Sequence, residues 1–172
     1  MLDVRSRHNL LVRSVAVLMS TLPATACNES SGNLPPTYEP VSGVWNYTNE
    51  GLVSNTCGAD DLYTDPSTEF YLTNSGDGTF TVLQQSEDNI DCSMSADAFV
   101  CPPGPGGSVD LEELSITVTW ELGFEGTFSS ATAMSGIMRV PFTCSGEACG
   151  LVSSVGITFP CAYEYAFSAT KA

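Results

Sequence analysis

The sequence predicts an all-β protein, a single antiparallel domain of roughly eight strands stapled by disulfides. Apolar and polar residues alternate along several segments, as they do in strands with one buried face. No stretch places apolar residues at helical spacing over three turns. Six cysteines remain once an N-terminal export signal and Cys27 at its boundary are set aside. A meandering barrel and a β-sandwich are the two architectures that suit these short strands and turns.

The first 26 residues have the features of an export signal. A start containing three arginines precedes a short apolar run, Val15–Leu22, and the small residues Ala24–Ala26 lie directly before Cys27. The run is far shorter than the roughly 20 residues of a membrane-spanning helix. The segment resembles bacterial lipoprotein signals, in which the cysteine is diacylated through its sulfur and becomes the mature N-terminus. The resemblance implies a lipid on Cys27, while an ordinary secretory signal cut nearby is the alternative.

Three segments follow from this division: a signal peptide at 1–26, a lipidated tether at 27–40, and a β domain at 41–172. The tether is polar, and its adjacent prolines, Pro35 and Pro36, favour extended conformations. The expected location is the cell envelope or cell surface, held at a membrane by the lipid, or the medium if the protein is secreted.

The domain is strongly acidic. After the signal is removed, Arg139 and Lys171 stand against 19 carboxylates, a formal charge of −17. Such a surface repels phosphate backbones, so nucleic acid is excluded as a partner. Solubility in a salty medium is one explanation for the acidity, and recruitment of divalent cations or a basic partner is the other.

The six remaining cysteines are expected to form three disulfides, because export leads to an oxidising compartment. Zinc is less suitable, since the closest pair has four residues between its members. Spacing favours two local bonds and one that joins the early and late parts of the chain. The predicted pairs are Cys92 with Cys101, Cys144 with Cys149, and Cys57 with Cys161.

The first predicted hairpin joins Glu69–Thr73 to Thr79–Gln84 through a turn at Asn74–Gly78, which is rich in glycine and Asn/Asp. The segment Leu114–Leu122 alternates most clearly and predicts a half-buried strand. A second hairpin is predicted from Gly123–Ser130 and Ser135–Thr143, with its turn at Ala131 and Thr132.

Residues Cys161–Ala169 predict the last strand, because aromatic and polar positions alternate along it. Two segments between these strands, Cys101–Ser108 and Cys144–Gly150, are predicted as loops, since proline and glycine are disfavoured in central strands.

Gly43-Val44-Trp45, near the start of the domain, resembles the glycine-x-tryptophan signature that opens the first strand of lipocalin-like barrels. In that family the tryptophan closes one end of the barrel, and an arginine from near the chain's end stacks on it. The resemblance implies these first-strand roles for Gly43 and Trp45. Arg139, the only arginine after the signal, lies on a strand predicted to precede the last one.

The domain lacks the residues that most common catalytic mechanisms require. The only histidine, His8, belongs to the signal segment, so the domain has no imidazole for a nucleophilic triad or a zinc site. No cofactor is expected, and the protein is predicted not to be an enzyme. Carboxylates alone remain for catalysis, as in glycosidases. The candidates fall mostly in turn-like segments and are Asp60, Asp61, Asp65, Glu87, Asp88, Asp91, Glu112 and Glu113.

No metal site is predicted, although Asp60, Asp61 and Asp65 are weak calcium candidates. The expected function is a non-catalytic envelope lipoprotein whose domain binds a small apolar ligand or a protein partner. The alternative is a secreted carbohydrate-binding protein or a carboxylate-dependent glycosidase. If the domain is a barrel, the residues expected to line a ligand cavity are Trp120, Phe124, Phe142, Tyr163, Tyr165 and Phe167.

Overall fold

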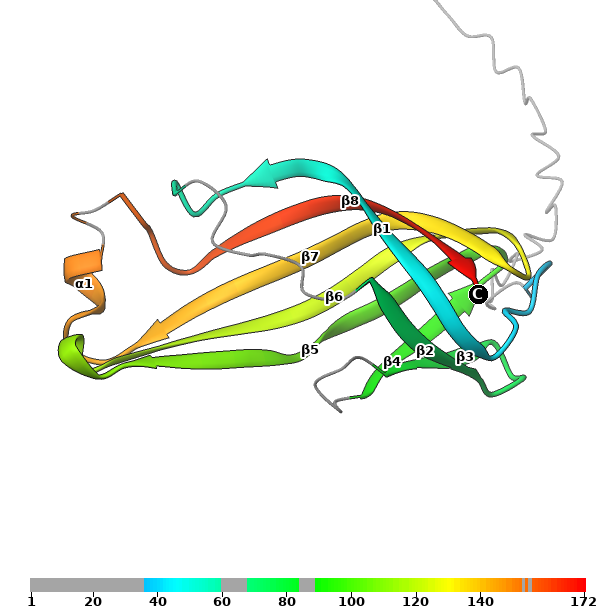
Figure 1. The fold of residues 1–172 in the computed structure, drawn as a ribbon, viewed down its shortest axis with the longest axis horizontal. Helices are drawn as coiled ribbons and strands as arrows, with labels where there is room; N and C mark the ends of the chain where they lie inside the picture. The colour runs from blue at the N-terminus through cyan, green and yellow to red at the C-terminus, as the bar shows by residue number, and fades with distance from the viewer. Residues whose placement is uncertain (1–35, 60–67, 84–88, 153, 155) are drawn as a thin grey trace, which may run out of the picture. The chain divides into compact units, whose positions relative to one another are not determined.

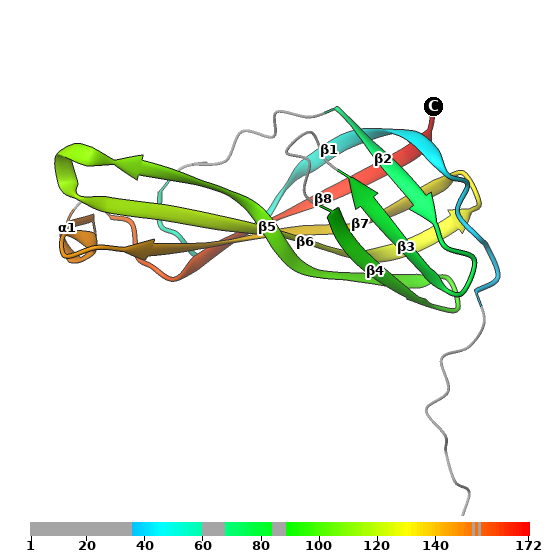
Figure 2. The ribbon, with the colours of Figure 1, turned by 90° about the horizontal axis from the view of Figure 1, so that it is seen from below.

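The computed structural model describes residues 36–59, 68–83, 89–152, 154 and 156–172. Within them, eight strands pair antiparallel in chain order, and β1 pairs with β8 to close the ring (Figures 1 and 2). The strands are β1 (Gly43–Asn55), β2 (Glu69–Asn74), β3 (Thr79–Leu83), β4 (Asn89–Ser95), β5 (Ala98–Leu111), β6 (Ile116–Ser130), β7 (Ala133–Ser145) and β8 (Cys161–Lys171). The all-β prediction is confirmed, and the strands form a closed meander instead of the two sheets of a sandwich.

The ring is irregular because its strands differ in length. β6 has 15 residues and β3 has five, which correspond to roughly 50 Å and roughly 17 Å of extended chain. The long strands β5 to β8 therefore continue well past β2, β3 and β4 (Figure 1). We call this continuation the extension and define it as residues 104–111, 116–122, 140–145 and 161–164.

Both predicted hairpins are present. β2 and β3 flank the turn after Asn74, where the Asn74 side chain accepts a hydrogen bond from the Gly76 amide at 3.0 Å. β6 and β7 meet at Ala131 and Thr132. The alternation predicted for the last strand is also observed, with Cys161, Tyr163, Tyr165, Phe167 and Ala169 buried on one face of β8.

The loop predicted at Cys101–Ser108 is wrong, because these residues lie within β5. Its prolines are tolerated since β4 pairs with β5 only as far as Val100, so the rest of the strand lies at an edge of the paired strands described here. The ladder to β6 also shifts register between Cys101 and Gly104 and again between Pro105 and Gly107. Such bulges accommodate residues that cannot join a regular ladder.

Two other boundaries differ from the prediction. The segment Cys144–Gly150 is only partly a loop: Cys144 and Ser145 end β7, and a single helical turn, α1 (Cys149–Val152), follows. The expected break at Gly123 is absent, because β6 runs through it, while Leu114 belongs to a short 3-10 turn, η1 (Glu112–Leu114).

β4 was not expected, since its acidic neighbourhood suggests a turn. Its buried residues Ile90, Cys92 and Met94 nevertheless alternate with exposed ones, and Asp91 lies on the outer face of this strand.

Several residues singled out in the sequence lie outside the described residues, as do the signal segment and most of the tether. They are Cys27, Asp60, Asp61, Asp65, Glu87 and Asp88.

The ring is filled by aromatic side chains. Phe80, Phe99 and Phe128 contact one another with ring centroids 5.1–5.6 Å apart, and Trp45 packs on Phe128 at 6.2 Å. Trp45 is fully buried, and its indole donates a hydrogen bond to the Val41 carbonyl oxygen at 3.0 Å. This end of the domain is therefore packed core.

The arginine contact that the lipocalin resemblance implies is not formed by Arg139. That side chain lies on the outer face, where its Nε is 3.7 Å from the Glu164 carboxylate. The residue opposite Trp45 in the ladder to the last strand is Lys171.

The disulfides join the pairs predicted from spacing: Cys57–Cys161, Cys92–Cys101 and Cys144–Cys149. The first joins the chain just after β1 to the start of β8, across a sequence separation of 104 residues. The second joins β4 to β5 where their pairing ends, and the third closes the turn between β7 and α1. Three disulfides are typical of an exported protein in an oxidising environment.

Candidate functional site

An apolar cavity of about 500 Å³ lies on the inner face of the extension. Its volume falls within the range of small-molecule sites, roughly 300–1,000 Å³. Every described lining residue has an uncharged side chain, and most are aliphatic. The lining consists of Val109, Leu111, Leu114, Ile116, Val118, Trp120, Phe142, Leu151, Val152, Ile157 and Phe159.

The strand ladders bring these residues to one face. Val109 of β5 lies opposite Val118 of β6, and Leu111 lies opposite Ile116. Opposite residues in an antiparallel pair project to the same side, and the period of two repeats that side at alternate positions. The alternation along β6 therefore builds one wall of the cavity directly from sequence.

Trp120 is held against two glycines of β5. A Cβ atom on Gly106 would lie 2.6 Å from Trp120 Cδ1, and one on Gly107 would lie 2.5 Å from Trp120 Cζ2. The indole therefore rests on bare backbone, and only glycine leaves room for it. On its other side, its ring centroid is 6.2 Å from that of Phe142. This packing orients a half-buried tryptophan at the cavity wall.

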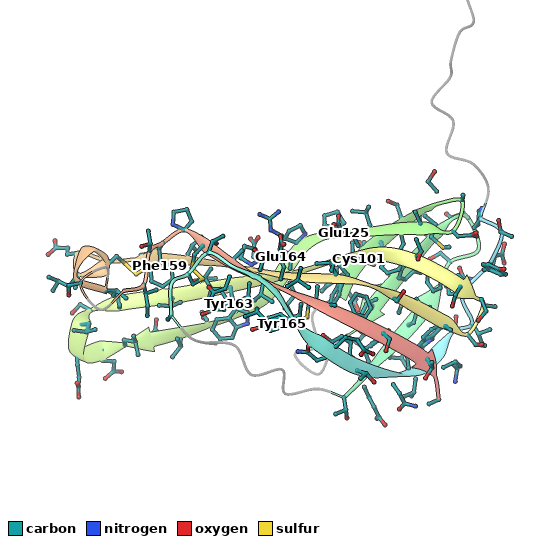
Figure 3. The ribbon with its side chains drawn as sticks, turned by 90° about the horizontal axis from the view of Figure 1, so that it is seen from above. Cys101, Glu125, Phe159, Tyr163, Glu164 and Tyr165 are labelled. Atoms are coloured by element: carbon teal, nitrogen blue, oxygen red, sulfur yellow. A yellow bond between two sulfur atoms is a disulfide. The ribbon has the colours of Figure 1, made fainter. Side chains whose placement is uncertain are left out.

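The end wall is formed by α1 and the chain that follows it, which contribute Leu151, Val152, Ile157 and Phe159. α1 lies at the far end of the long strands, and Phe159 lies on the segment leading from it into β8 (Figures 1 and 3). The Cys144–Cys149 disulfide ties α1 to the end of β7. A single helical turn is not stable alone, so this bond and the apolar contacts hold the wall in place.

The six residues predicted to line a cavity divide into three groups. Trp120 and Phe142 line it. Tyr163, Tyr165 and Phe167 do not and instead fill the core, with Tyr163 packed on Phe142 at 5.8 Å. Phe124 borders a separate hollow of about 150 Å³ that also includes Arg139 and Glu164.

These positions follow from the two faces of β8. Tyr163 and Tyr165 are buried, whereas Glu164 between them lies on the opposite, outer side (Figure 3). The tyrosines were predicted as lining because aromatic side chains suit both a core and a cavity. Because Tyr163 and Tyr165 are buried on the inner face of β8, they belong to the core.

Most of the lining was not predicted from sequence. Val109 and Leu111 follow the proline- and glycine-rich stretch for which the sequence predicts a loop, and Leu151 to Phe159 carry no alternation. The alternation of apolar and polar residues in SVDL, at 108–111, is the signal that could have extended β5 to Leu111.

Acidic residues surround the outer end of the cavity. Asp110, Glu112 and Glu113 are exposed at the end of β5 and on η1. The Asp110 carboxylate accepts a hydrogen bond from the Thr117 hydroxyl at 2.7 Å, which fixes it on the outer face. Exposed carboxylates therefore border the apolar lining at the end of β5.

Comparison with known proteins gives no match. No protein-family model matches the sequence, and neither a curated protein nor a solved structure is significantly similar to it. The described helices are all too short to cross a bilayer. Among the residues that the structure describes, no group of three or more His, Cys, Asp or Glu side chains is arranged to hold a metal ion.

Proposed function

We propose that this chain is a lipid-anchored protein of the cell envelope whose β domain binds an uncharged, apolar small ligand in the cavity of the extension. The observation that carries the proposal is the composition of that cavity. About 500 Å³ of space is bordered by hydrocarbon side chains and a half-buried tryptophan. Leaving such a surface in water is unfavourable, and an apolar ligand removes the cost.

The lining also defines the class of ligand. Burial of a methylene group is worth about 0.8 kcal/mol, so an alkyl chain of eight such groups gains roughly 6 kcal/mol before the cost of association. No described lining residue is ionisable. A charged headgroup would therefore have to remain outside, and the acidic rim at Asp110, Glu112 and Glu113 disfavours an anionic one. An alkyl chain or a flat hydrocarbon with a neutral polar end fits best.

The carbohydrate alternative has less support. Sugars are bound through hydrogen bonds to hydroxyl groups, and glycoside cleavage needs two carboxylates flanking the bond. The cavity's described lining has no carboxylate, and the indole N–H of Trp120 is its one side-chain hydrogen-bond donor. Glu112 and Glu113 lie outside it on η1 and are exposed.

Titration with N-phenyl-1-naphthylamine, an uncharged dye that fluoresces in apolar surroundings, tests the proposal. We expect saturable binding by the wild type and a loss of about tenfold or more in affinity for Leu114→Glu, which places a charge on the lining. Leu83→Glu is the matched control, because the two leucines are similarly exposed, at 38% for Leu83 and 44% for Leu114, and only Leu114 lines the cavity. Equal dye affinities of Leu114→Glu and Leu83→Glu, or no dye binding by the wild type, would refute the proposal.

The anchor is a separate part of the proposal and rests on Cys27 at the boundary of the export signal. Two acyl chains on this residue would give stable membrane attachment. Intact-mass measurement of protein extracted from membranes is expected to show a chain that begins at Cys27 and carries the added acyl mass. A soluble chain of unmodified mass would exclude the anchor without bearing on the cavity.

A further inference from the structure

We propose that the outer edge of β5 between Gly107 and Leu111 is a docking site for an extended segment of a partner protein in which apolar and basic residues alternate. The partner would add to the sheet as a further strand beside β5. This inference rests on the unpaired edge and on charge, and two residues of that edge, Val109 and Leu111, also line the cavity.

The edge is open along this stretch. The ladder between β4 and β5 ends at Val100, whereas the ladder between β5 and β6 continues to Leu111. No other described segment pairs with β5 beyond Val100, and every residue from Gly107 to Leu111 is exposed. A strand in this position presents backbone N–H and C=O groups ready to pair with another chain.

The stretch is also regular and contains neither proline nor a β-bulge. Residues 107–111 pair one to one with residues 120–116 of β6. The prolines and both bulges of β5 come earlier, between Cys101 and Gly107, and block pairing there. The exposed part of β1 differs, because two register shifts near Gly51 and Val53 distort its edge. Among the described strands, the end of β5 is therefore the better template.

Side chains along this edge specify the pattern of the partner. Val109 and Leu111 project to the apolar inner face, where they border the cavity, and Val109 is 45% exposed. Asp110 lies between them on the outer face and is held there by Thr117. Cross-strand neighbours of matching character stabilise a pair of strands. A partner with apolar residues beside Val109 and Leu111 and a basic residue beside Asp110 satisfies both faces.

Charge decides between a partner protein and a second copy of this chain. Glu112 and Glu113 follow the edge directly, and the domain after the signal has a formal charge of −17. A second copy would bring the same excess of negative charge to the interface, which is repulsive. A basic segment is attracted instead, and the attraction weakens as salt is added.

Fluorescence anisotropy of a short fluorescein-labelled peptide of alternating lysine and valine tests the proposal, with the full β domain as the binding protein. We expect binding that weakens with salt. A peptide of alternating glutamate and valine, and the lysine peptide with every backbone amide N-methylated, are both expected not to bind. The methylated peptide keeps the charge and loses every donor to the ladder, so equal binding by it would show that only charge attraction is involved and would refute strand addition.

Variants of β5 locate the site. Val109→Lys, which adds a charge at the open edge, is expected to weaken binding roughly tenfold or more. Val100→Lys is the matched control, because Val100 is similarly exposed, at 50%, yet is paired on both sides by Ser93 and Glu125. Unchanged binding by Val109→Lys, no binding of the lysine peptide at low salt, or dimerisation of the domain in sedimentation that the same variant abolishes would overturn the proposal. Because Val109 also lines the cavity, Val109→Lys is expected to weaken dye binding as well, whereas Val100→Lys is expected to leave both dye and peptide binding unchanged.

Discussion

Trp120 lies across the backbone of Gly107, its partner in the ladder between β5 and β6. The two residues are opposite each other, and a Cβ atom on Gly107 would lie 2.5 Å from Trp120 Cζ2. Gly107 also has a φ of +152°, which side-chain-bearing residues rarely adopt. This relationship sets the position of the one tryptophan that lines the cavity.

Gly107→Ala is therefore expected to displace the indole and to cost about 1–3 kcal/mol in the free energy of unfolding. The emission of Trp120 should shift to longer wavelength as the ring leaves its packed position. Denaturant unfolding and fluorescence spectra measure both effects. Gly150→Ala is the control, because a Cβ atom there meets nothing within 4 Å. A shift of similar size in both variants would show that Gly107 is not required for the indole.

The disulfides are expected to contribute unequally to stability. Cys57 and Cys161 are 104 residues apart, whereas Cys144 and Cys149 are five apart. The entropy lost by the unfolded chain on cross-linking grows with loop length, which gives about 4.7 kcal/mol for the long loop and about 2 kcal/mol for the short one. Replacing each pair by alanine and comparing unfolding midpoints tests this ranking. A larger loss for the Cys144–Cys149 pair would contradict it.

Asp77 provides a local test of pH dependence. The Thr79 hydroxyl donates a hydrogen bond to its carboxylate, and this bond lowers the pKa of Asp77 below the ordinary value of 3.8. Because the folded state favours the charged form, the resulting stabilisation is complete above the ordinary pKa and is lost as the pH falls through the folded pKa.

Thr79→Val is expected to raise the pKa of Asp77 towards its ordinary value, as measured by a carboxyl carbon NMR titration. Thr81→Val is the matched control, because the Thr81 hydroxyl bonds to Asp91 at 3.1 Å and not to Asp77. An unchanged Asp77 titration in Thr79→Val would assign the lowered pKa to another cause.

The sequence predicts the parts of this fold in which local pattern and tertiary structure agree. β8 and the β2–β3 hairpin follow from alternation and from turn residues at Asn74–Gly78, which act locally. The disulfide pairs follow from spacing, because two short loops leave one long-range pair, Cys57 with Cys161. These features need no knowledge of which strands lie side by side.

β5 and the cavity could not be predicted in this way. Prolines exclude a segment from a central strand, but the Cys101–Ser108 stretch lies at an edge, and edge position depends on how far β4 extends. The lining by Leu151 and Phe159 likewise depends on the position of α1 and the chain after it at the end of the long strands. Aromatic residues occur both in the core and in the cavity lining. Only the structure therefore distinguishes Tyr163, a core residue, from Trp120, a lining residue.

The most direct test of the proposed ligand site is quenching of tryptophan fluorescence by 11-bromo-1-undecanol, a neutral alkyl chain that carries a heavy-atom quencher. The chain has two tryptophans: Trp45 is fully buried in the ring, and Trp120 lines the cavity. We expect saturable quenching of the wild type and none of Trp120→Phe, whose remaining emission comes from Trp45. Absence of quenching in the wild type, or equal quenching in both proteins, would contradict the assignment of the cavity as an apolar binding site.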